Sequence, residues 1–69
     1  MQILAQRLKE LRISHGYKQT EVAEALGLSI SAYCRYEHGE REPQASVLVN
    51  MADYYDVSVD YLVGRTDER

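Results

Sequence analysis

Three polar side chains with different chemistry recur at helical spacing in and just after segment 30–37. Ser31, Arg35 and His38 lie at i, i+4 and i+7, which places them on one side of an α-helix, with Ile30 and Cys34 flanking them. A hydroxyl, a guanidinium and an imidazole can hydrogen-bond to base edges and to phosphates. The stripe indicates a surface that reads a nucleic acid. The simpler interpretation is a solvated helix face, which an exposed isoleucine fits poorly.

Two of these residues allow other chemistry. Cys34 and His38 are four residues apart, a spacing at which two residues of one helix can bind a metal ion. Zinc takes four ligands, however, and the chain has only one other histidine, His15, and no second cysteine. We therefore expect no metal. Arg35 and His38 could lower the pKa of the Cys34 thiol and make it sensitive to oxidation. The alternative, which we favour, is a small exposed residue of no consequence.

The elements that must position the stripe are two short helices joined by a tight turn. Segments 19–26 and 30–37 are the predicted helices, and Gly27 between them can take the positive φ that such a turn needs. Ser29 is a good N-cap for the second helix. Ala23 is small enough to let the two helices cross steeply. The pattern predicts a helix-turn-helix.

The buried sides of these two helices follow from their periodicity. Val22, Ala23 and Leu26 form one apolar stripe on the first helix. On the second helix, Tyr33 and Tyr36 share the side opposite the polar stripe, together with Glu37. The tyrosine hydroxyls must then reach water or a partner.

Three further helices, over residues 2–14, 45–55 and 59–63, complete a compact all-α bundle of five. The expected inner residues are Leu4, Leu8, Leu11 and Ile13 in the first, Leu48, Met51, Ala52 and Tyr55 in the second, and Leu62 in the third. Ser58 caps the last helix. We expect some of Tyr54, Tyr61 and Val63 to remain exposed. Residues 1–64 form the domain, and residues 65–69 a polar tail that frays.

At these residues the chain resembles the Cro/repressor-type (Xre-type) helix-turn-helix family, and the resemblance covers roughly residues 8–64. The matching residues are Arg12, Gln19, Ala23, Gly27, Glu37, Gly39 and Pro43, followed by the segment VSVDYLVG at 57–64. The resemblance implies a lambda-repressor-like bundle. It also implies that Arg12 pairs with Glu37, so that Arg12, Ala23, Gly27 and Glu37 are structural residues.

The resemblance further implies which residues contact DNA. Ile30, Ser31 and Arg35 match the positions that reach into the major groove. Among them Arg35 is best suited to a specific contact, because its fork matches guanine O6 and N7. Ile30 could meet a thymine methyl group.

The residues expected to contact phosphate lie around the reading helix: Lys18, Gln19, His38 and Arg41. Lys18 stands where the family usually has serine or threonine at the helix start. Lysine cannot accept hydrogen bonds from the free backbone N–H groups there, so it is unfavourable as a cap. A phosphate bound at this helix start would make Lys18 favourable, because the N–H groups and the lysine would share one anion. Glu40 and Glu42 flank Arg41, which predicts modest, strongly salt-dependent affinity.

Composition limits the possibilities. The chain has 69 residues, one cysteine and a net charge of −3, which is unusual for a nucleic-acid-binding domain. The acid is concentrated in residues 42–69, which hold two Lys/Arg against six Asp/Glu, whereas residues 1–41 hold six against five. No signal peptide, membrane-spanning segment, phosphate loop or catalytic constellation is apparent. We expect a cytoplasmic protein that is not an enzyme, with no cofactor and no small-molecule substrate.

The leading hypothesis is a sequence-specific double-stranded DNA-binding transcriptional regulator, a repressor that binds a near-palindromic operator as a homodimer. The alternative is a protein-interaction module, such as an antitoxin or an anti-regulator, built on the same fold. The acidic balance and the surplus tyrosines favour the alternative. A steep salt dependence of duplex binding would favour the regulator.

Overall fold

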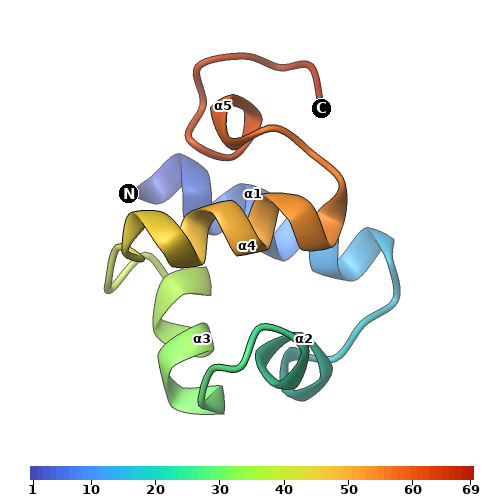
Figure 1. Cartoon of the computed structure of the whole chain (residues 1–69), viewed down its shortest axis with the longest axis vertical. Helices are drawn as coiled ribbons and strands as arrows, with labels where there is room; N and C mark the ends of the chain where they lie inside the picture. Colours follow the sequence, from blue (N-terminus) through green and yellow to red (C-terminus); the bar gives the residue numbers. More distant parts are fainter.

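The computed structural model describes all 69 residues and contains five α-helices and no strand (Figure 1). The helices are α1 (Gln2–Ser14), α2 (Gln19–Ala25), α3 (Ile30–Glu37), α4 (Ala45–Tyr55) and α5 (Val59–Leu62). The predicted all-α five-helix fold is confirmed. Only the ends of α2 and α5 differ from the predicted ranges, each by one residue.

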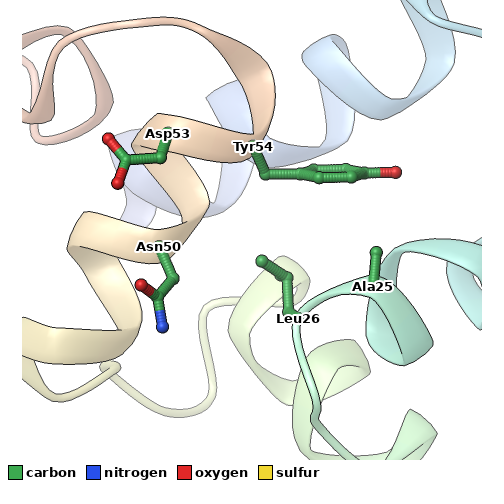
Figure 2. A pocket seen from close by; sticks show the side chains of 5 residues that line it. All are labelled: Ala25, Leu26, Asn50, Asp53 and Tyr54. Carbon is green, nitrogen blue, oxygen red and sulfur yellow. The ribbon is translucent and has the colours of Figure 1, made fainter.

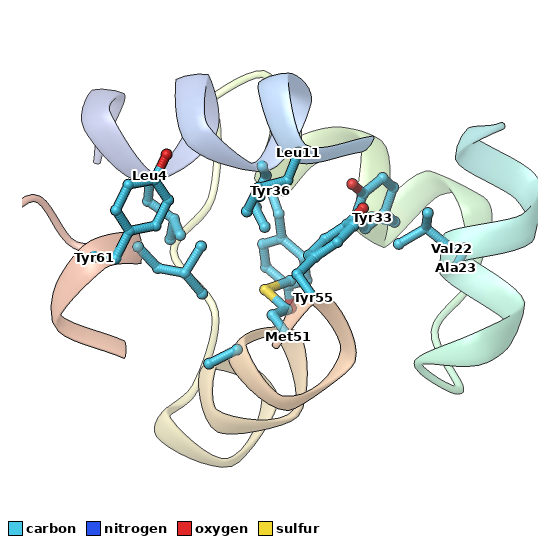
Figure 3. Packing of buried hydrophobic residues seen from close by; sticks show 12 residues of the cluster. Leu4, Leu11, Val22, Ala23, Tyr33, Tyr36, Met51, Tyr55 and Tyr61 are labelled. Carbon is cyan, nitrogen blue, oxygen red and sulfur yellow. The ribbon is translucent and has the colours of Figure 1, made fainter. Parts of the chain in front are cut away.

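The core lies between α1 and α4, with α2 and α3 at one end and α5 at the other (Figure 3). Tyr33 is among its largest fully buried side chains, which gives this small domain an aromatic centre. The buried apolar cluster consists of Leu4, Leu8, Leu11, Val22, Ala23, Tyr33, Tyr36, Met51, Ala52, Tyr55, Tyr61 and Leu62. All five helices contribute to this single core, so the position of α3 depends on the whole bundle.

Local side-chain caps begin two of the helices as predicted. The hydroxyl of Ser29 accepts the N–H of Ala32 at 3.1 Å, and the hydroxyl of Ser58 accepts the N–H of Tyr61 at 3.0 Å. These bonds satisfy one of the free donors at each helix start. Lys18 supplies no such cap to α2. Its own N–H instead donates to the Glu21 carboxylate at 2.9 Å.

One expectation about burial was wrong. Ile13 is 59% exposed and does not widen the inner stripe of α1. At about 100° per residue it lies on the side opposite Leu4, Leu8 and Leu11. Of the three residues of which we expected some to remain exposed, Tyr54 and Val63 are partly exposed. Tyr61 is 7% exposed and belongs to the core, and the Arg7 guanidinium covers its ring, with the guanidinium carbon 4.2 Å from the ring centroid.

The polar tail does not fray as we expected. Arg7 of α1 donates to the backbone carbonyls of Tyr61 and Thr66 and forms an ion pair of 2.7 Å with Asp67. The N–H of Ser58 donates to the carbonyl of Arg69 at 3.0 Å. Residues 65–69 are therefore folded back against α1 and α5.

Candidate nucleic-acid interface

The turn between α2 and α3 has the geometry that its residues predict. Gly27 has φ of 69°, in the left-handed region where a Cβ atom is strained. The N–H of Leu28 donates to the carbonyl of Ala23 at 2.9 Å, which closes the end of α2. Ala23 itself is 1% exposed. The two helices pack against each other, and the turn fixes the direction in which α3 leaves the bundle (Figure 1).

An ion pair joins the inner side of α3 to α1. The Arg12 guanidinium donates three hydrogen bonds of 2.9–3.1 Å to the Glu37 carboxylate and a fourth, of 3.1 Å, to the carbonyl of Tyr17. The Glu37 side chain is 1% exposed. Burial alone would raise the pKa of Glu37, but the hydrogen bonds and charge of Arg12 lower it on balance. The predicted Arg12–Glu37 pair is present in the structure.

Two buried tyrosines lie beside this pair, and one of them, Tyr33, does not behave as expected. The hydroxyls of Tyr33 and Tyr55 are buried and have no hydrogen-bond partner, although we expected the Tyr33 hydroxyl to reach water or another group. Figure 3 shows both rings in the core next to α1. Burial raises the pKa of Tyr55 to about 12 and also raises the pKa of Tyr33. Both phenols therefore stay neutral at physiological pH.

The outer side of α3 presents the three residues predicted to read bases. Ile30 is 52% exposed, and Ser31 and Arg35 are also exposed. The Ser31 hydroxyl and the Arg35 guanidinium make no hydrogen bond or ion pair within the chain, so both are free to bind a ligand. The arrangement is an exposed apolar, hydroxyl and guanidinium surface on a helix whose back is fixed by the core.

The residues predicted to contact phosphate lie at the margins of this surface. Lys18 and Arg41 are exposed and form no ion pair, and the Arg41 guanidinium lies 5.9 Å from the centroid of the Tyr36 ring. His38 is exposed and lies 3.9 Å from the Glu40 carboxylate. Of the two glutamates that flank Arg41, the negative charge of Glu42 is partly compensated, because the amino terminus lies 3.3 Å from its carboxylate.

Gln19, the fourth predicted phosphate residue, has partners that sequence reasoning missed. Its amide lies between two side chains of α3, accepting from the Cys34 thiol and donating to Glu37, each at 3.5 Å. Cys34 is half-buried and is therefore not the simple exposed residue that we favoured. No spacing rule could reveal these contacts, because they join positions 15 and 18 residues apart on different helices.

Other surface features lie away from α3. A hollow of about 340 Å³ separates the end of α2 from α4 and is lined by Ala25, Leu26, Asn50, Asp53 and Tyr54 (Figure 2). None of the residues predicted to contact DNA lines it. No group of three or more His, Cys, Asp and Glu side chains is arranged to hold a metal ion. No helix is both long enough and apolar enough to span a lipid bilayer.

Comparison with known proteins identifies the fold family. A family model described as helix-turn-helix matches residues 8–62. The chain belongs to this helix-turn-helix family. The resemblance to Cro/repressor-type proteins is thus confirmed across most of the chain and not only over α2 and α3.

Similar helix-turn-helix proteins are described as regulators or repressors. The chain is 43% identical over 63 residues to the uncharacterized HTH-type transcriptional regulator YobD of Bacillus subtilis, covering 91% of this chain and 56% of YobD. It is 39% identical over 64 residues to the HTH-type transcriptional regulator ImmR of the same organism, covering 93% of this chain and 50% of ImmR. The chain thus spans about half the length of these relatives.

Solved helix-turn-helix structures share the whole arrangement. The P22 c2 repressor, solved in complex with a synthetic operator, superposes with a TM-score of 0.83 at 26% identity, over 90% of this chain and 94% of that chain. The similarity extends over both the bundle and the α2–turn–α3 unit. The fold that carries the candidate interface is therefore one that a known operator-binding repressor also uses.

Proposed function

We propose that this helix-turn-helix chain is a sequence-specific double-stranded DNA-binding transcriptional regulator that acts as a repressor. One observation carries the proposal. The outer side of α3 presents Ile30, Ser31 and Arg35 exposed and unpaired, while Glu37 on the inner side ties the helix to α1. A rigid helix with free polar groups on its outer face suits insertion into the major groove.

Base reading is assigned to three side chains. Arg35 donates in bidentate fashion to guanine O6 and N7, and its lack of an intramolecular partner leaves both guanidinium edges free. Ser31 donates to or accepts from a neighbouring base edge, and Ile30 contacts a thymine methyl group. Arg35 therefore supplies most of the discrimination between sequences.

Phosphate contacts are assigned to Lys18, Gln19, His38 and Arg41. Their contacts position the protein on the duplex without reading sequence. Lys18 and Arg41 are unpaired, which supports this role despite the overall charge of −3. The acid that produces the negative charge lies mainly in residues 42–69, which include α4 and α5.

The dimensions of the chain support binding as a dimer. Its Cα atoms extend over 28 × 23 × 19 Å, whereas successive major grooves on one face of a duplex are about 34 Å apart. One copy presents one α3 and reads one half-site. Two copies related by a two-fold axis read a near-palindromic operator, and repression follows where the occupied operator excludes other proteins.

The test is selection from a random duplex pool at two salt concentrations. We expect enrichment of a two-fold symmetric site with half-sites about one helical turn apart. Arg35→Ala should lower affinity for that site by about 1–3 kcal/mol and relax the preference at one base pair of each half-site. Arg41→Ala should weaken binding to all sequences and reduce the salt slope by about one.

A matched control separates base reading from loss of charge. Arg65→Ala also removes one exposed arginine, but Arg65 follows α5 and lies only 3.8 Å from Asp60. It should leave the enriched site unchanged. If Arg65→Ala and Arg35→Ala changed binding equally, α3 would not be the reading helix. If the folded protein enriched no duplex at low salt, the protein-interaction alternative would replace the proposal.

A further inference from the structure

The side-chain amide of Gln19 is held from both ends. The thiol of Cys34 donates to Gln19 Oε1 at 3.5 Å, and Gln19 Nε2 donates to Glu37 Oε1 at 3.5 Å. Cys34 and Glu37 are three residues apart on α3, which puts them on neighbouring turns of one side. The amide at the start of α2 therefore bridges two adjacent side chains of the reading helix.

The chemistry of the three groups allows only one orientation of this amide. A carboxylate only accepts hydrogen bonds, so Nε2 must face Glu37. A thiol can donate, so Oε1 faces Cys34. The flipped amide would set its oxygen against the carboxylate, which is repulsive. Because Nε2 carries two hydrogens and Glu37 accepts one, the second remains for another acceptor.

The carboxylate that sets this orientation is itself fixed. Glu37 receives three hydrogen bonds from Arg12, and its side chain is 1% exposed. Gln19 is half-buried, so its amide lies where the core meets the surface. A connected series of groups thus runs from Arg12 through Glu37 and Gln19 to Cys34.

We propose that Cys34 and Glu37 are positioning residues for Gln19, holding its amide so that one N–H is directed to a DNA phosphate. The proposal rests on the proposed function, which assigns the phosphate contact to Gln19. Without the thiol, the Gln19 side chain samples more rotamers in the free protein and loses that freedom on binding. This ordering weakens affinity, while the same phosphate contact can still form.

Two substitutions of nearly equal size isolate the donor. Cys34→Ala removes the thiol, whereas Cys34→Ser keeps a hydroxyl that can donate to Gln19. On the duplex enriched by selection, we expect Cys34→Ala to weaken binding about two- to fivefold, as for a modest hydrogen bond. Cys34→Ser should restore affinity to within about twofold of the original. Thermal unfolding checks that both variants are folded. Because alanine is the better helix former, weaker binding by Cys34→Ala than by Cys34→Ser would not come from a less stable α3.

A double-mutant cycle shows whether Cys34 acts through Gln19. Gln19→Ala should weaken binding to a similar extent at every salt concentration and leave the slope of log K against log salt unchanged, because a neutral amide releases no counterion from the phosphate. In the Gln19→Ala background, Cys34→Ala should have no further effect. Equal losses in both backgrounds would show that Cys34 acts on DNA by another route and would overturn the positioning role.

A measurement on the free protein separates this inference from the proposed function. The ¹⁵N heteronuclear NOE of the Gln19 side-chain amide should fall in Cys34→Ala and recover in Cys34→Ser, because it reports motion of the amide directly. An unchanged NOE in Cys34→Ala would overturn the positioning role even if the protein binds DNA. A protein with the expected NOE changes that binds no duplex would instead overturn the proposed function, and the phosphate role of Gln19 with it.

Discussion

Removing the guanidinium of Arg12 tests the connection between the core and the reading helix. Arg12→Ala deletes all three hydrogen bonds of 2.9–3.1 Å that Glu37 receives from the guanidinium. The carboxylate remains in a site where its side chain is 1% exposed. Only the amide of Gln19, at 3.5 Å, still donates to it. The variant therefore contains a buried charge with almost no compensation.

The expected cost is a large part of the stability of the fold. Removing one member of a buried pair destabilises a protein by about 3–5 kcal/mol. Whole domains are stable by only about 5–15 kcal/mol, and a chain of this size belongs near the lower end. For a domain of 60–100 residues, each kcal/mol moves the melting temperature by about 4–8 °C. Arg12→Ala should therefore melt at least about 12 °C below the original protein.

The effect should depend on pH in a defined direction. In the original protein Arg12 lowers the pKa of Glu37 below its ordinary value of 4.5, despite the opposing effect of burial. This contribution to stability is present above pH 4.5 and is lost as the pH falls through the lower folded-state pKa. In Arg12→Ala the charge and hydrogen bonds of Arg12 no longer oppose burial, which raises the pKa of Glu37. Acid neutralises the stranded charge as the pH falls through this raised pKa, so the stability difference between the two proteins begins to narrow above pH 4.5. It narrows further below pH 4.5, where the original protein loses the contribution of its ion pair.

Thermal and urea unfolding followed by far-ultraviolet circular dichroism, at neutral pH and at several acid pH values, measure these differences in melting temperature and in free energy of unfolding. Arg65→Ala is the matched control, because it removes an arginine whose only ion pair is exposed. The double variant Arg12→Met/Glu37→Leu removes both charges and should recover most of the lost stability. An unchanged melting temperature for Arg12→Ala at neutral pH would refute the reasoning, as would a double variant no more stable than Arg12→Ala.

Three further predictions concern other parts of the bundle. Gly27→Ala should cost about 1–2 kcal/mol in urea unfolding, because φ there is +69° although the space around the residue is open. Tyr33→Phe should leave the free energy of unfolding unchanged or raise it by up to about 1 kcal/mol, because the hydroxyl that it removes is buried without a partner. A clear loss of stability in urea unfolding would contradict this. Arg7→Gln should destabilise the domain by about 1 kcal/mol or more and speed hydrogen exchange at the Ser58 amide, because Arg7 holds the tail whose carbonyl that amide contacts.

Features encoded within a few residues could be predicted from the sequence. Ser29 and Ser58 begin helices because a cap needs only the next three residues. Gly27 marks the turn for the same local reason. The inner residues of α1 follow from periodicity, and the same rule, applied strictly, would have placed Ile13 outside. The Arg12–Glu37 pair was predicted through family resemblance, since no local rule joins positions 25 apart.

The sequence by itself determined five helices, a turn at Gly27 and an outer stripe on α3, because each depends on contacts between residues close in the chain. Only the tertiary structure decided what surrounds those elements. It placed Gln19 between Cys34 and Glu37, joined Arg7 to the C-terminal residues and left two tyrosine hydroxyls without partners. These arrangements depend on how helices distant in sequence cross and fill one small core, and packing of that kind has no signature in spacing or composition.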